Sequence, residues 1–327
     1  MRNLRVTVHG LPDDRWRALE VAFWLLPLAA YFLFPKHAVL GSQILITALF
    51  AVSLDLVLGY AGILSLGHAA FFGLGAYTAG LLSVHGWGEP LSGLVIAAGV
   101  AAIAGFAVSF LVVRGQDLAR LMVTLGIGLM LFEAANKAAV ITGGVDGLSG
   151  VSTWKLFGAF PFGLDGRTAY WYSLAVLFAL FVLLRRIVNS PFGLSLRGIR
   201  DGGKRMPAIG SPVAHRLTAA FTLGAMLAGI AGALLAQTTQ FVGLDSFGFP
   251  RSAEILIMLV LGGAGRLYGA VLGAAVYMIA QDVLSGINPV YWQFWIGLML
   301  VVVVLFAKDG LLGGAARVRA RFAARRG

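Results

Sequence analysis

Serine and histidine occur close together in one glycine-rich stretch, which is the nearest this chain comes to a catalytic motif. Ser65 and His68 lie in the segment from residue 59 to 68. A hydrolase nucleophile elbow requires the pattern Gly-x-Ser-x-Gly, whereas two residues separate Gly62 from Ser65 and only one separates Ser65 from Gly67. No carboxylate stands beside the histidine to orient it. We therefore expect these side chains to form hydrogen bonds and not to catalyse a reaction.

A second stretch comes close to a phosphate-binding loop. Residues 198 to 204 match the spacing Gly-x₄-Gly-Lys, but Arg205 stands where Ser or Thr would bind magnesium. No strand pattern precedes the stretch, so we interpret it as a basic, flexible loop and expect no ATP hydrolysis by this chain. The sequence has no cysteine and no His-Glu-x-x-His spacing. It therefore predicts no metal site and no cofactor of its own.

The composition excludes a soluble protein. Of 327 residues, 59% are hydrophobic and 12% are charged, whereas soluble domains have roughly 45–50% apolar and about 25% charged residues. A membrane-spanning helix takes about 20 apolar residues. The sequence therefore predicts an all-α polytopic membrane protein.

Apolar stretches separated by polar or Gly/Pro breaks predict ten spans, some of them broken. We place these spans near residues 18–34, 39–58, 69–84, 91–113, 118–140, 169–184, 217–237, 253–263, 267–285 and 290–306. Residues 253–285 fit either one broken helix or two crossings. The predicted organisation is a cytoplasmic N-terminal segment (1–17), a transmembrane domain (18–306) with a long cytoplasmic loop (185–216), and a basic cytoplasmic tail (307–327).

The net charge of +11 is explained by membrane topology, without nucleic acid as a partner. With these spans and a cytoplasmic N-terminus, 20 of the 25 basic residues lie on the cytoplasmic side, as the positive-inside rule requires. Both termini are basic, so the number of crossings is expected to be even, with both ends in the cytoplasm of a bacterium. The predicted location is the inner membrane, where lipid head groups attract the basic loops.

Two glycine-rich stretches interrupt apolar segments in the two halves of the chain, at residues 59–68 and 262–265. Half-helices are tolerated at membrane depth only where protein or water satisfies the loosened backbone. Paired interruptions of this kind indicate a transporter path.

Polar groups inside predicted spans are candidates for that path, because a charge in hydrocarbon is costly. The candidates are Asp55, Ser65, His68, Glu254 and Gln281. The alternative is that each lies near enough to a span end to reach water. Glu133 and Lys137, four residues apart on one helix, can neutralise each other.

Four stretches, taken in order, carry a resemblance to a known family. They are residues 59–79 (GYAGILSLGHAAFFGLGAYTA), 142–150 (TGGVDGLSG), 197–201 (RGIRD) followed by 228–234 (AGIAGAL), and 261–265 (LGGAG) with 269–274 (GAVLGA). Together they resemble the M-type permease subunit of the high-affinity branched-chain amino acid ABC importers. The resemblance extends from about Val39 to Phe306.

This resemblance implies the ABC importer permease fold and transport by alternating access. It also implies four kinds of partner: a second, homologous permease, two cytoplasmic ATPases that hold the ATP and magnesium, a periplasmic binding protein and the membrane lipid. Residues 197–210 would dock on an ATPase, with Pro207 starting a short helix. The residues that this loop would contribute to coupling are Arg197, Arg200, Asp201, Ala208 and Gly210.

The cargo is left open by the sequence, since the binding protein, a different chain, largely sets specificity in such importers. Branched-chain or related amino acids are expected, and urea or a short-chain amide is the alternative within the family. Two other classes remain possible in principle: an ion-coupled secondary carrier, compatible with Asp55, and a membrane-anchored interaction protein.

Overall fold

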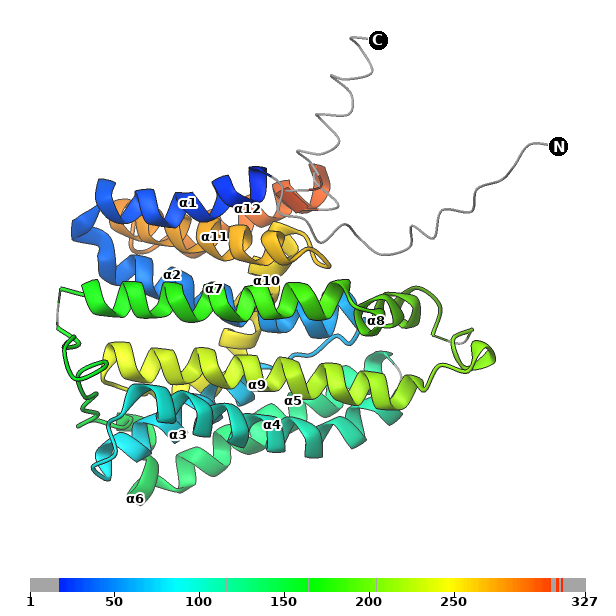
Figure 1. Ribbon diagram of the computed structural model, residues 1–327, viewed down its shortest axis with the longest axis horizontal. Coiled ribbons are helices and arrows are strands. Elements are labelled where there is room, and N and C mark those ends of the chain that lie inside the picture. Colours follow the sequence, from blue (N-terminus) through cyan, green and yellow to red (C-terminus); the bar gives the residue numbers. More distant parts are fainter. Residues whose placement is uncertain are drawn as a thin grey trace, which may run out of the picture.

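The computed structural model describes residues 18–306, except 116, 164 and 204, together with 310, 311 and 313. The described chain is helical, and its helices lie side by side in one bundle (Figure 1). The α-helices are α1 (Ala18–Leu33), α2 (Ala38–Leu54), α3 (Ala69–Val84), α4 (Pro90–Arg114), α5 (Asp117–Lys137), α6 (Ala139–Thr142), α7 (Arg167–Asn189), α8 (Pro191–Gly202), α9 (Val213–Thr239), α10 (Phe249–Gly262), α11 (Leu267–Ile287) and α12 (Trp292–Phe306).

Five short helical turns complete the described elements. They are η1 (Pro35–His37), the π-helical turn η2 (Asp55–Tyr60), η3 (Gly144–Asp146), η4 (Pro207–Ile209) and η5 (Leu244–Phe247).

Each predicted span overlaps one α-helix, which confirms the all-α class. Six described helical segments are long and apolar enough to cross a membrane, and three shorter apolar helices correspond to α1, α3 and α12. The helix α10, with 14 residues, is too short to cross alone. It is separated from α11 by a turn, so residues 253–285 form two helices.

An ion pair fixes which helix ends lie together. Glu20, in the first turn of α1, contacts Arg185 of α7 at 2.9 Å. This pair places the start of α1 at the end of the bundle that carries α8, hereafter the α8 end (Figure 1). The helix α7 continues to Asn189. Arg185, expected in the loop 185–216, therefore lies inside a helix, where Glu20 offsets its charge.

Small residues let α3, α4 and α9 approach closely. A Cβ atom on Gly75 of α3 would overlap the backbone of Gly229 in α9, and one on Gly229 would overlap the side chain of Ala101 in α4. Gly105 faces Ala225 in the same way. Because hydrocarbon offers no hydrophobic driving force between helices, such backbone proximity supplies the packing energy.

Gly75→Ala is expected to destabilise the chain by about 1–3 kcal/mol, the usual cost of overpacking a filled core. Gly99→Ala is the matched control, since nothing lies within 4 Å of a Cβ at Gly99. Thermal unfolding in detergent should show a lower melting temperature for Gly75→Ala and an unchanged or higher one for Gly99→Ala. Equal melting temperatures would contradict the proposed packing.

Candidate functional site

The first interruption follows α2. The helix passes into the π-helical turn η2, and the chain then runs without helix from residue 61 to 68 before α3 begins. Gly62 has a φ of +72°, which glycine adopts without strain. Asp55, Ser65 and His68 all lie here, and each is at most 1% exposed. The predicted break is therefore present, and it is enclosed by protein.

Side chains from three helices form hydrogen bonds with the non-helical segment near the start of α3. The His68 imidazole Nε2 lies 2.9 Å from the Ser53 hydroxyl of α2. The Ala69 amide donates to Ser252 Oγ of α10 at 2.9 Å, and the Leu66 amide donates to Thr124 Oγ1 of α5 at 3.3 Å. Non-helical backbone at membrane depth requires such partners.

The second interruption separates α10 from α11. Gly263 and Gly265 have φ values of +105° and +79°, so the chain reverses through conformations that favour glycine. This turn lies against η2, because the Asp55 carboxylate accepts a hydrogen bond from the Gly265 amide at 2.6 Å. The two interruptions, 210 residues apart in sequence, therefore meet.

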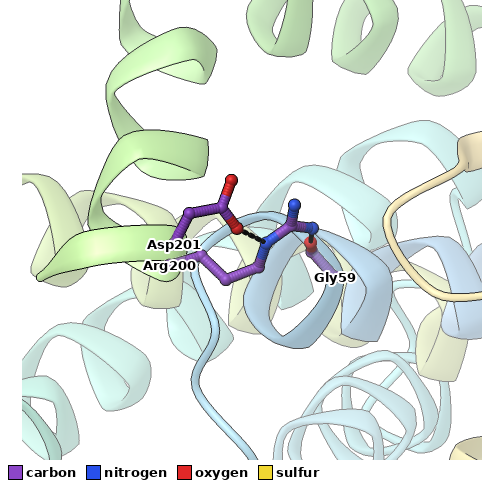
Figure 2. Close-up of polar contacts among 3 residues, drawn as sticks. All are labelled: Gly59, Arg200 and Asp201. Carbon is purple, nitrogen blue, oxygen red and sulfur yellow. Dashed lines mark hydrogen bonds and ion pairs between the residues drawn. The ribbon is translucent and has the colours of Figure 1, made fainter.

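Helix α8 contacts the place where the two interruptions meet. Arg200 donates from Nη1 to the carbonyl of Gly59, as Figure 2 shows. The Arg197 guanidinium lies 5.1 Å from the centroid of the Tyr60 ring. We name Asp55, Gly59, Arg197, Arg200 and Gly265 the α8 junction.

The α8 junction follows from elementary helix chemistry. The last carbonyls of a helix lack intrahelical donors, and a cation is favoured at a helix C-terminus. Arg200 supplies both a hydrogen-bond donor and a positive charge at the end of the helix that ends at Tyr60. The fit is close, because a Cβ on Gly59 would overlap the Asp55 carboxylate and the Gly265 amide.

The remaining predicted coupling residues lie on the exposed side of this region. The Asp201 carboxylate accepts a hydrogen bond from Arg200 Nε at 2.9 Å (Figure 2). Ala208 and Gly210 are exposed in and after η4, which starts at Pro207 as the sequence predicts. Lys204 is outside the described residues.

Glu254 and Gln281 lie on α10 and α11. Glu254 forms a 3.5 Å ion pair with Arg251 on α10, and the Arg251 guanidinium lies 5.5 Å from the centroid of the Phe72 ring. Gln281, half-buried on α11, is one turn beyond Tyr277. Asp55, Ser65 and His68 thus lie at the first interruption, and Glu254 and Gln281 lie on α10 and α11. The role of these five candidate residues in a path stays a prediction.

Arg251 was not among the candidate residues, because the charge count made it one of the five basic residues that do not lie on the cytoplasmic side. Its contact with Phe72, near the start of α3, places it between the helices. The available signal was an arginine and a glutamate three residues apart, at the start of an apolar run.

No group of three or more His, Cys, Asp or Glu side chains that could hold a metal ion occurs among the described residues.

A family model for the permease component of branched-chain amino acid transport systems matches residues 39–304. The chain belongs to this family. This result confirms the family that the glycine-rich stretches predicted. The permease is therefore a multi-pass membrane protein and a component of a transport system.

Three relatives show how far the similarity extends. The permease is 31% identical to the high-affinity branched-chain amino acid transport system permease protein LivM of Escherichia coli K12, over 89% of this chain and 74% of the relative. It is 24% identical to LivH of the same strain, over 81% and 91%. It is 30% identical to LsrC of Yersinia pseudotuberculosis, an autoinducer 2 import system permease protein, over 73% and 67%. No solved structure matches the chain significantly.

Proposed function

We propose that this permease is one membrane subunit of an ATP-driven importer for branched-chain or related amino acids. The family match and the LivM relative support the class of transporter. The observation that carries the mechanism is the α8 junction, because there α8 binds the first interrupted segment at the place where that segment meets the second.

The proposed orientation has ten crossings and both termini in the cytoplasm. Helix α10 would complete its crossing together with the non-helical residues that precede it. The pairing of α1 with α7 supports an arrangement in which the start of the first helix and α8 share one side. The basic residues of the 185–216 loop then face the cytoplasm of a bacterial inner membrane.

Coupling would run through α8. ATP and magnesium would bind to two cytoplasmic ATPase partners, and the exposed residues of α8 and η4 would dock on one of them. Movement of α8 would then shift Arg200 relative to the Gly59 carbonyl, and so change how the two interrupted segments meet. Alternating access requires such a two-state element.

The proposed assembly has further subunits. LivM and LivH bear permease names of one system in the relatives, which supports a second, homologous permease as partner. A periplasmic binding protein would deliver the cargo. The LsrC relative is named for a different cargo, so a urea or short-amide permease remains the alternative within the family, and an ion-coupled carrier the alternative outside it.

Gentle affinity purification from native membranes is expected to recover the permease with a second permease and two ATPases, each identified by mass spectrometry. Deleting residues 201–210 should remove the ATPases and leave the helical bundle folded, because Arg200 and its hydrogen bond to the Gly59 carbonyl are kept. A complex that keeps its ATPases after this deletion would contradict the docking proposal, and a lone permease would contradict the assembly.

Arg200→Gln is expected to lower the substrate moved per ATP hydrolysed by about tenfold, because hydrogen bonds to charged groups contribute about 1.5–3 kcal/mol. The control is Arg186→Gln, which removes the same charge from an exposed position at the end of α7. Both are measured with the reconstituted complex. An Arg200→Gln complex that transports like the control would contradict coupling through the α8 junction.

A further inference from the structure

Two oppositely charged, partly exposed side chains lie near the start of α10. Arg251 and Glu254 pair at 3.5 Å, and their side chains are 28% and 32% exposed. One turn beyond Glu254 on α10 is Ile257, which is half-buried. A charged pair thus lies one turn before a partly exposed apolar side chain.

Contacts with neighbouring helices place this pair at membrane depth. Ser252, next to Arg251, binds the Ala69 amide, and the adjacent His68 contacts Ser53 of α2. Ser53 is about 10 Å from the end of η2 and about 22 Å from the start of α2, at 1.5 Å per residue. The hydrocarbon core of a bilayer is about 30 Å thick, so the pair lies well inside it.

Charged groups at this depth need a polar environment. Half-exposed charges are costly against lipid tails, and such residues mark substrate pathways or contacts within the protein. Figure 1 shows α10 crossing the middle of the bundle, between the two interruptions. Interrupted helices at mid-depth are where transporters bind their substrates.

We propose that Arg251 and Glu254 form a recognition site for the zwitterionic head of an amino acid on its path through the permease. The Arg251 guanidinium binds the substrate carboxylate through paired hydrogen bonds. The Glu254 carboxylate binds the substrate ammonium group, and the apolar side chain lies against Ile257, one turn along α10 from Glu254. This inference rests on the proposed function and names the substrate class of that path.

Charge conservation makes the exchange feasible at this depth. The internal ion pair opens and two ion pairs to the substrate replace it, so the site is neutral before and after. Because the internal pair must be broken, binding is weak, and the substrate can leave again, as conduction requires. Urea or a short amide carries no opposite charges and offers no such exchange.

The test uses the double variant Arg251→Gln/Glu254→Gln. Removing one charge alone would leave the other uncompensated inside the protein and endanger folding, whereas the double variant keeps the region neutral. The matched control is Glu133→Gln/Lys137→Gln, which removes a 3.9 Å pair from an exposed face of α5.

The first readout is leucine uptake per ATP hydrolysed by the reconstituted complex. The double variant should lose at least tenfold, the scale of a lost hydrogen bond to a charge, and the control should match the wild type. Normal uptake by the double variant would overturn the proposal, because a merely structural ion pair is replaceable by neutral groups. Loss of the second permease from the complex would also overturn it, by assigning the pair to the subunit interface.

The second readout tests whether Arg251 and Glu254 bind an amino acid, and it does not depend on ATP-driven transport. Binding to the folded state raises the melting temperature, so millimolar leucine should stabilise the purified wild-type permease, and leucinamide, which lacks the carboxylate, should not. The double variant should respond to neither compound. A wild-type permease that ignores leucine, or a double variant that still responds to it, would overturn the recognition site.

Discussion

The satisfaction of backbone hydrogen-bonding groups away from water is the constraint on which this structure depends. An intact helix pairs its own backbone amides and carbonyls, but two segments within the bundle of the permease are not helical. Three of the open groups there are matched by side chains from elsewhere in the chain: Ser252 for the Ala69 amide, Asp55 for the Gly265 amide, and Arg200 for the Gly59 carbonyl. These contacts bind distant parts of the sequence into one site.

The same constraint explains why glycine is so frequent. Gly59 and Gly265 allow two backbones to approach within reach of one carboxylate, and Gly75 and Gly229 bring α3 against α9. A larger side chain at these positions would separate the elements and leave the polar groups without partners. Packing and hydrogen bonding are therefore coupled at the interruptions, and the proposed movement of α8 would act on both.

Apolar length and glycine placement were sufficient to predict the all-α class, the positions of the apolar helices and both interruptions. Residues 198–202, expected in a flexible loop, instead belong to α8, because apolar length does not reveal a short amphipathic helix. The grouping of the polar residues could not be predicted from apolar length and glycine placement either. Asp55 and Gly265 are 210 residues apart, and no local pattern states that they meet. Charge counting assigns residues to sides of a membrane and has no means of recognising the ion pair that Arg251 forms with Glu254 on α10. Arg185 was placed in a loop for the same reason, since its partner Glu20 lies on a different helix.

The central claim is that this permease works as an ATP-driven importer subunit, with its movement imposed from outside the membrane through α8. The most direct measurement is leucine uptake by the complete reconstituted complex, with ATP held constant and an uncoupler added to collapse ion gradients. The account predicts that uptake continues at the same rate and stops when ATP is withdrawn. Uptake that stops with the uncoupler, or that proceeds without ATP, would contradict it and indicate an ion-coupled carrier.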